Sequence, residues 1–443
     1  MTAEHDRLTE ASRILRGCEE TVRLMRALSW SPTIKARFFA HGARRMPRVT
    51  YPRRSQQSVH EGVAAARRLI QGRSLALDWL NRQADMIELS ARMVEALGTA
   101  DFHRLSAEVY GLPTTPLVDG KSTSLQLARR IDRVLERLDP GHLGSDPEPL
   151  SATELARAIQ RSVDALLGHA APRVLVVQAL SAKATSSTKF IRIRADATFT
   201  KEDVQQLVMH EAMVHVTTTL NGRRQRRLPI LAVRHPGTTR TQEGLAVFCE
   251  LMSGALGPSR LRRLANRVLA IQRSMEGADF MELYRFFVDQ TGDPSQSFED
   301  ARRIVRGSLL DGGAPFTKDG VYLDGLVRVH NFMRAVVELT RPDLIPLLFC
   351  GKMDIEDIPA IYQLAQEGLV LRPRYVPPWV EDRRFIVSYL TYTGFLSRIR
   401  LKPVREHYTR LLSSCRGLRD DFVEDGTIPP SDSSPGAHGA PQG

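Results

Sequence analysis

The spacing of two histidines constrains the fold of this chain more than any other feature of its sequence. Residues 210–215 read His-Glu-Ala-Met-Val-His, and the surrounding sequence favours a helix. At about 100° per residue, position i+4 lies ~40° from position i around a helix, whereas position i+5 lies ~140° away. A regular helix would therefore direct His210 and His215 to different faces. A π-bulge, which adds one residue to the turn and is frequent at functional sites, would bring both imidazoles to one face.

A downstream carboxylate completes a candidate metal-binding set. Glu243 lies where a second helix is predicted to begin, at about Thr241. A carboxylate at a helix start can simply be a favourable partner of the helix dipole. Two His and one Glu, however, are a common ligand set of catalytic zinc, which leaves a fourth position open for water. Glu250 follows seven residues later on the same helical face and could orient a ligand, although a surface salt bridge is its more ordinary role.

Helical periodicity dominates the chain, and one short β region precedes the histidine motif. Residues 173–177 and 190–194 are rich in β-branched side chains and predict two strands, joined by the polar segment 181–188. Isoleucine and arginine alternate in the second strand, which predicts that it is half-exposed. The sequence therefore predicts an α+β fold that is predominantly helical, with a short strand pair beside the motif helix.

The motif helix has recognisable start and stop signals. Thr200, followed by Asp203, is a plausible N-cap, and Asn221-Gly222 is a stop signal. The domain boundaries predicted from these patterns are a basic N-terminal helix with an extended connector at 1–57, a helical region at 58–170, the core at 171–426 and a disordered tail at 427–443.

The composition limits the classes of protein. The 443 residues include 42% hydrophobic residues, enough for a substantial core, and the net charge of +12 favours acidic partners. The four cysteines form no CxxC pair, so neither a disulfide framework nor a cysteine zinc site is predicted. No apolar run approaches the ~20 residues of a membrane span, and the acidic N-terminus does not resemble a signal peptide. We therefore expect a cytoplasmic protein that does not enter the membrane.

HExxxH followed by QEGLA at 242–246 resembles the flavohaemoglobin expression-modulating QEGLA-motif proteins of bacteria. Those proteins share one domain family with the microtubule-associated tyrosine carboxypeptidases of animals. Residues 303–307 (Arg-Ile-Val-Arg-Gly) and 316–325 (Phe-Thr-Lys-Asp-Gly-Val-Tyr-Leu-Asp-Gly) resemble the later family signature RxxRG…FTKDxxYLxG. The resemblance covers roughly residues 60–420. It implies a zincin-like metallopeptidase core.

The resemblance also implies roles for individual residues. His210, His215 and Glu243 correspond to the ligands of one zinc ion, and Glu211 corresponds to the general base. Gln242 stands where the animal proteins have the first Glu of EEGLA, so the shared ligand is Glu243. The animal enzymes act on tubulin, but this chain looks bacterial, and only the reaction class carries over. That class is zinc-dependent hydrolysis of a peptide bond, carboxypeptidase-like.

Further residues are candidates for binding the substrate. Tyr322 is the candidate donor to the tetrahedral oxyanion, with His330 as a second candidate that a structural role would explain better. A carboxypeptidase also needs a cation for the terminal carboxylate, and Arg306 and Lys318 are the candidates. The arginines within 223–227 would favour an acidic peptide or protein C-terminus as partner, although a solvated basic loop is the more ordinary explanation for them.

Two other classes of function remain open. A peptidase fold that has lost catalysis would act as a regulator or scaffold, but zinc kept for stability alone would not require the intact Glu211. Residues 21–54 hold nine Arg or Lys and no acid, which could attract nucleic acid. No nucleic-acid-binding motif accompanies this segment, and aromatic residues make up only 6% of the chain. Nucleic acid is therefore the least expected partner.

Overall fold

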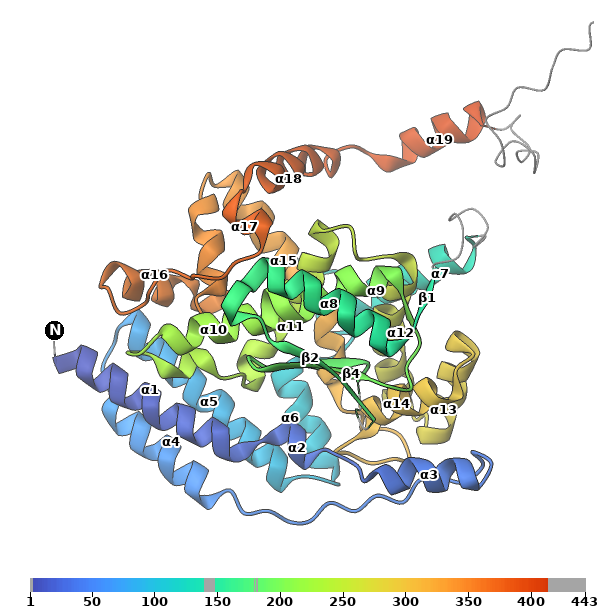
Figure 1. Ribbon diagram of the computed structural model, residues 1–443, viewed down its shortest axis with the longest axis horizontal. Helices are drawn as coiled ribbons and strands as arrows, with labels where there is room; N and C mark the ends of the chain where they lie inside the picture. Colours follow the sequence, from blue (N-terminus) through green and yellow to red (C-terminus); the bar gives the residue numbers. More distant parts are fainter. Residues whose placement is uncertain (1–2, 139–147, 179, 181, 413–443) are drawn as a thin grey trace, which may run out of the picture. The chain divides into compact units, whose positions relative to one another are not determined.

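The computed structural model describes residues 3–138, 148–178, 180 and 182–412 (Figure 1). The predicted tail at 427–443 lies outside these residues. Residues 1–391 form one compact unit and residues 392–443 a second. In the second unit, the structure describes the end of α18 (Arg384–Leu396) and α19 (Leu401–Leu411), whose side chains are largely exposed.

The first helix is part of the core of the first unit. α1 (Ala3–Val22) packs against α4 (Gln57–Leu69) and α5 (Leu75–Glu95), and the three helices lie side by side in Figure 1. Leu8 and Leu15 of α1 are 1% and 0% exposed. Apolar side chains at helical spacing thus tie the N-terminus to the rest of the unit.

The connector predicted as extended contains a helix, α3 (Pro32–Ala40), so that part of the prediction is wrong. Ser31 caps this helix, because its hydroxyl accepts a hydrogen bond from the backbone N–H of Thr33. Pro32 fits the first helical position, where no N–H donor is needed. Phe38 is 3% exposed and packs against other aromatic rings. The Ser-Pro pair therefore starts a helix within the segment that was expected to be extended.

A three-stranded sheet lies beside the motif helix. β2 (Arg173–Val177) and β4 (Phe190–Arg194) match the two predicted strands and pair in parallel. The polar connection between them contains a strand that the sequence reading missed, β3 (Ala184–Ser186), which pairs antiparallel with β4. The strand order is β2-β4-β3. Ile191 and Ile193 are fully buried, which accounts for the alternating isoleucines. The strand is not half-exposed as expected, because Arg194 is only 3% exposed and donates to Gln296 Oε1.

The motif lies in one long continuous helix with an irregular middle. α9 (Lys201–Leu207) leads into the π-helix η3 (Val208–Val216), which continues as α10 (Thr217–Arg224). Thr200 forms the predicted cap, since its backbone N–H donates to the side chain of Asp203. The predicted start and the predicted π-bulge of this helix are both confirmed.

The residues predicted to stop this helix instead attach it to its neighbours, and the helix ends two residues later. Asn221 donates from Nδ2 to the carbonyl oxygens of Phe349 (2.8 Å) and Tyr375 (2.7 Å). A Cβ atom on Gly222 would collide with the backbone of Leu231. Glycine is needed here because two backbone segments touch, not because the helix ends.

The second motif lies on α11 (Pro236–Met252), which begins five residues before the predicted start at Thr241. α11 crosses α15 (Val321–Glu338) at two glycines, because a Cβ on Gly244 would collide with the carbonyl of Gly325. The glycine of QEGLA therefore lets two helix backbones touch. This close crossing brings the FTKDGVYLDG segment next to the histidine motif.

The remaining helices enclose these elements. Among the described residues, no helix is long and apolar enough to cross a membrane. The predicted class, α+β and predominantly helical, is confirmed. The other elements are α2 (Leu24–Ala27), α6 (Ala100–Tyr110), α7 (Ser124–Glu136), β1 (Pro149–Leu150), which pairs with β5 (Phe199–Thr200), α8 (Ala152–Leu167), η2 (Gly168–Ala170), η4 (Pro229–Ala232), α12 (Pro258–Met275), α13 (Phe280–Thr291), α14 (Pro294–Val305), η5 (Thr317–Gly320), η6 (Pro342–Phe349), η7 (Ile355–Asp357), α16 (Ile358–Gln366) and α17 (Pro378–Glu381).

Candidate metal centre

The π-helix places His210 and His215 on one face. Their ring centroids are 4.9 Å apart and the rings are nearly perpendicular. The wide turn is supported by side chains that reach its carbonyl oxygens: Thr217 Oγ1 donates to Met213 (2.7 Å), and Thr218 Oγ1 donates to Val214 (2.6 Å). Hydroxyls that bond back to the preceding turn commonly distort helices. The local sequence thus supplies the groups that stabilise the bulge.

Glu243 of α11 faces both imidazoles. Its Oε2 atom lies 3.5 Å from His210 Nε2 and 3.4 Å from His215 Nε2. One ligand atom from each of the three residues lies within 4.8 Å of the others. Glu243 Oε2 is buried, and no described group donates a hydrogen bond to it. A buried carboxylate oxygen without a donor is costly, and a cation held by all three side chains would remove that cost. The donor set therefore fits a metal ion.

The other oxygen of this carboxylate is engaged by cations. Arg234 Nη1 donates to Glu243 Oε1 (3.2 Å), and Lys318 Nζ lies 3.7 Å from the same atom. Burial would raise the pKa of Glu243, but Lys318 and Arg234 outweigh it and hold the pKa well below its usual range. The carboxylate is therefore ionised and has Oε2 free to ligate.

The two histidines differ in their electrostatic surroundings. Burial lowers the pKa of His215, and the positive charge of Arg234 lowers it further, which keeps this imidazole neutral. Burial also opposes the charge on His210, but Glu243 and Glu250 raise the pKa of His210 to about 10. A metal ion would therefore displace a proton from His210 when it binds.

Glu250 orients His210 from behind, and the expectation of a surface salt bridge is wrong. Glu250 is fully buried, and its Oε1 accepts a hydrogen bond from His210 Nδ1 (2.6 Å). Arg260 donates to both carboxylate oxygens at 2.9 Å, and Gln206 Nε2 donates to Oε1 at 3.0 Å. Burial would raise the pKa of Glu250, but Arg260 and His210 lower it to about 2. With Nδ1 donating to this carboxylate, Nε2 of His210 points its lone pair at the metal position.

Glu211 lies next to the ligands on the π-helix. Its Oε2 accepts a hydrogen bond from Ser186 Oγ on β3 at 2.5 Å. The short third strand therefore has a local purpose, since it fixes the orientation of this carboxylate. Glu211 lines both hollows that adjoin the metal position. That placement suits a proton acceptor for a water molecule near the metal.

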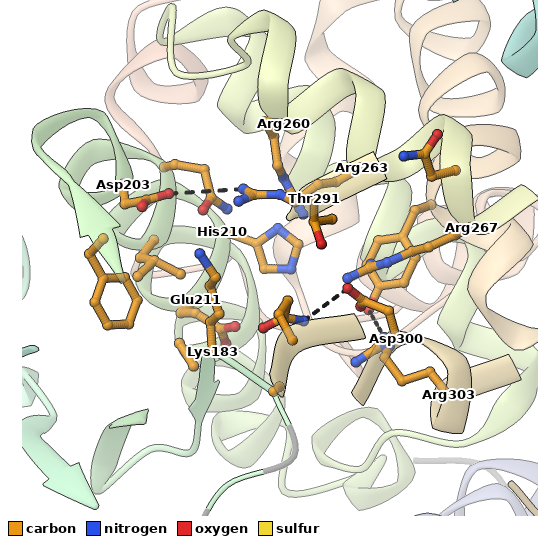
Figure 2. A pocket seen from close by; sticks show the side chains of 18 of the residues that line it. Lys183, Asp203, His210, Glu211, Arg260, Arg263, Arg267, Thr291, Asp300 and Arg303 are labelled. Carbon is orange, nitrogen blue, oxygen red and sulfur yellow. Dashed lines mark hydrogen bonds and ion pairs between the residues drawn. The ribbon is translucent and has the colours of Figure 1, made fainter. Parts of the chain in front are cut away.

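Two hollows meet at these residues. One is a cleft of about 660 Å³, and the other is a smaller cavity of about 120 Å³, which Figure 2 shows from close by. His210, Glu211, Arg303 and Tyr322 line both. All three candidate ligands line the wide cleft, and His210 also lines the narrow cavity.

Tyr322 lies within reach of this centre. Its ring is nearly parallel to that of His210 at 6.4 Å, and its hydroxyl accepts a hydrogen bond from Arg303 (3.5 Å). Burial and Glu243 would raise the pKa of Tyr322, but Lys318 and Arg303 lower it below its usual value. A phenol of lowered pKa is a stronger hydrogen-bond donor, as an oxyanion requires.

The other predicted residues lie in different places. Arg306 and Lys318 line the large cleft, 7% and 5% exposed, and Arg223 lines it as well. The three arginines that follow within 224–227 are exposed and are not among the cleft-lining residues. His330 packs against Phe248 (6.0 Å between ring centroids) and lines neither hollow. A packing role accounts for its position.

Sequence reasoning missed two cations beside the ligands. Arg234 lies just before α11, and the only sequence feature near it is the His235-Pro236 pair at the start of that helix. Lys352 Nζ donates to the carbonyl of His215 (2.9 Å) and to Gln242 Oε1 (3.1 Å). No local motif marks Lys352, which reaches the site only through the fold.

Comparison with protein-family models matches residues 36–398 to the family described as microtubule-associated tyrosine carboxypeptidase. No curated protein sequence gives a significant match. The matched residues include both motifs, the later signature segment and every side chain placed around the metal position above. The resemblance seen in the sequence is confirmed at the level of the domain family. The chain belongs to the microtubule-associated tyrosine carboxypeptidase family, a family of peptidases.

Proposed function

We propose that this chain is a zinc-dependent, carboxypeptidase-like peptidase that acts near the C-terminus of a peptide or protein. The observation that carries the proposal is the position of Glu243 Oε2, which is buried without a donor among the described residues and lies 3.4–3.5 Å from two imidazole nitrogens. Two imidazoles and one carboxylate leave a fourth tetrahedral position open, as catalytic zinc sites do. Nitrogen ligands also favour zinc over magnesium or calcium.

The residues around the metal position have distinct parts in the proposed reaction. Zinc, when bound, would lower the pKa of water and polarise the scissile carbonyl. Glu211, held by Ser186, accepts the proton of the attacking water and passes it to the leaving amine. Tyr322, whose hydroxyl accepts a hydrogen bond from Arg303, is the proposed donor to the oxyanion, which needs donors aimed at its final position.

The cleft favours an acidic substrate. Eight cationic and four acidic side chains line it, and two of the acids are Glu211 and Glu243. Arg306 and Lys318 are substrate-binding residues in this proposal, and Lys318 also neutralises Glu243. A cationic cleft attracts acidic chains and speeds their association at low salt. The proposed partner is therefore an acidic peptide or protein tail in the cytoplasm.

Metal analysis and peptide hydrolysis test the proposal together. We expect one zinc per chain in the wild type by elemental analysis, and loss of that zinc in His215→Ala and Glu243→Ala. Glu211→Gln should keep the zinc but lose cleavage of C-terminally diverse peptides by a factor of about 10²–10⁴, the usual contribution of a general base. An exposed carboxylate on the same helix, Glu202, provides the matched control Glu202→Gln.

Each other outcome has a definite meaning. A protein without stoichiometric metal would contradict the assignment of the ligands. Zinc without cleavage of any peptide, in wild type and Glu211→Gln alike, would instead support a catalytically silent regulator or scaffold built on the peptidase fold.

A further inference from the structure

The basic segment at 21–54, which the proposed reaction does not use, forms part of the surface of the first unit. Eight of its nine cationic residues are exposed arginines. The ninth, Lys35, is partly buried and pairs with Glu299 at 3.3 Å. Among the described residues, no acid forms an ion pair with any of the eight arginines. The fold therefore leaves a run of positive charge without acidic partners inside this unit.

The segment packs its apolar residues inward, which turns the arginines outward. After α3, residues 47–56 form no helix or strand, and they run along the lower edge of the ribbon in Figure 1. Val49 and Tyr51 pack against the buried aromatic cluster beneath α3. The hydroxyl oxygen of Tyr51 also accepts hydrogen bonds from Trp30 Nε1 (2.7 Å) and from the backbone N–H of Gly307 (2.6 Å). These contacts hold the segment in place on the unit.

The arginines of this segment begin at the rim of the large cleft. We call the eight exposed arginines from Arg23 to Arg54 the basic edge. Two of them, Arg23 and Arg26, line the cleft that holds the candidate ligands. One more lies on α3, and the remaining five lie at 44–54. The positive charge of the cleft therefore continues along the chain onto the outer surface of the unit.

We propose that the basic edge binds an acidic, extended segment of the substrate protein, which continues from the C-terminal residues held in the cleft. This inference rests on the proposed peptidase function, because the cleft would hold the end of the same substrate chain. Carboxylates suit these arginines, since a guanidinium group can donate two parallel hydrogen bonds to one carboxylate. Exposed ion pairs are individually weak, so several of them together set the affinity.

The surface of the segment favours an acidic polypeptide over other occupants. The whole chain has a net charge of +12, so a second copy would be repelled. Single-stranded nucleic acid stacks its bases on aromatic side chains, but no aromatic residue of 21–54 is exposed, and Trp30 and Phe38 are only 7% and 3% exposed. A lipid surface needs an apolar face beside the cations, and Met25 and Met46 alone do not form one.

Binding of matched peptides to the zinc-loaded Glu211→Gln protein tests the inference without turnover. Each probe carries fluorescein and ends in Ala-Ser-Ala-Tyr with a free carboxylate. The upstream part has about 12 residues, enough to extend about 40 Å, and alternates Gly with either Glu or Gln. At about 0.01 M salt, where charges act over about 30 Å, we expect the Glu probe to bind about 10–100-fold more tightly by fluorescence anisotropy. Each exposed ion pair contributes up to about fivefold of this preference.

Removing three charges of the basic edge tests the surface itself. Arg48→Gln, Arg53→Gln and Arg54→Gln together should reduce the preference for the Glu probe to less than about one third of its original value. None of these three residues lines either hollow at the metal position. In the active protein, the loss should appear in the KM of the Glu probe and not in kcat, because a docking site binds substrate and transition state equally.

The matched control lowers the net charge by the same amount on a different helix. Arg129, Arg130 and Arg133 are exposed on α7, and none of them pairs with a described acid. Arg129→Gln, Arg130→Gln and Arg133→Gln together should leave the preference for the Glu probe unchanged. Zinc content and circular dichroism check that both triple variants are folded.

Contrary results separate the two proposals. Equal binding of the Glu and Gln probes, or an equal loss of preference in both triple variants, would overturn this inference. Tighter binding of a single-stranded oligothymidine than of the Glu probe would assign the surface to nucleic acid and overturn it as well. A preference lost only in the variant of the basic edge, in a protein that cleaves neither probe, would support the docking surface while the peptidase function fails. Cleavage of both probes with the same KM would do the reverse.

Discussion

A single buried carboxylate controls the chemistry of the first histidine. Glu250 accepts from His210 Nδ1, and Arg260 and Gln206 hold the carboxylate in place. With Nδ1 so engaged, the other ring nitrogen is the one that can ligate. The partner of a metal ligand also raises the basicity of that ligand. Glu250 is therefore expected to tune metal affinity without touching the metal.

We expect Glu250→Gln to weaken zinc binding about 10–100-fold, the usual effect of losing the partner of a metal-bound histidine. Competition with a fluorescent zinc chelator measures the affinity. Glu276→Gln, at an exposed glutamate of the same unit, is the control and should not change it. An unchanged zinc Kd in Glu250→Gln would show that the contact serves packing alone.

At this scale the sequence predicted the residues that carry a motif and missed those that do not. The structure brings His210, His215 and Glu243 together, as the motif with a π-bulge and the family resemblance implied. Ser186 and Lys352 lie in segments without any local signal, and they reach the site through a strand pairing and a helix contact. Burial of Glu250 could not be read from its sequence position, because its partners Gln206, His210 and Arg260 come from other helices.

At the scale of elements, the two glycines where α11 crosses α15 decide how closely the two motifs approach. Gly244→Ala would place a methyl group against the carbonyl of Gly325, and the helices cannot separate without moving Glu243. We expect a loss of about 3 kcal/mol in the free energy of unfolding, at the upper end for overpacking. Urea unfolding measures it.

Gly17→Ala provides the control for that substitution. Gly17 lies within α1, and a Cβ atom there would have nothing within 4 Å. Replacing a helical glycine in open space should stabilise the protein by about 0.5–1 kcal/mol. Similar effects of the two substitutions would mean that the α11–α15 crossing is not tight.

The elements that sequence reasoning predicted well are those with strong local signals. The π-bulge followed from helix geometry, and β2 and β4 followed from β-branched runs. β3 was missed because three short polar residues resemble a loop until a neighbouring strand pairs with them. The start of α11 was placed late because its first turn contains Pro, Gly and Thr, which ordinarily indicate a connection.

At the scale of the whole molecule, α1 lies before the matched residues 36–398 and yet contributes to the large cleft. Glu19 lines that cleft, and its buried Oε2 has no hydrogen-bond donor among the described residues. Burial raises the pKa of Glu19 from 4.5 to about 8. The folded protein therefore keeps this proton to a higher pH than the unfolded chain does.

The raised pKa of Glu19 determines the direction in which the stability of the protein changes with pH. The stability that the protonated Glu19 provides is fully present below pH ~4.5 and is lost as the pH rises through about 8. When the pH rises from 5 to 9, the free energy of unfolding should fall in the wild type by about 2 kcal/mol more than in Glu19→Gln. This value is smaller than the full pKa shift implies, because Glu19 is partly exposed and solvent screens its charge. Chemical denaturation at both pH values measures this. Glu20 is exposed, so Glu20→Gln should lose as much stability between the two pH values as the wild type does. An equal loss in Glu19→Gln would contradict the assignment of the raised pKa to Glu19.

The π-helix also absorbs one residue within the motif helix. His215 follows the wide turn and yet shares a face with His210, so the turn takes up the extra residue without changing the phase of the helix that follows. Deleting one residue within 212–214 would therefore restore an ordinary α-helix with the two histidines four apart. Asn221 and Gly222 lie beyond the turn and would keep their contacts with the carbonyl oxygens of Phe349 and Tyr375 and with the backbone of Leu231. Histidines spaced four or five residues apart can thus present the same pair of ligands on one scaffold, so the spacing of the motif can change while the rest of the helix stays in register.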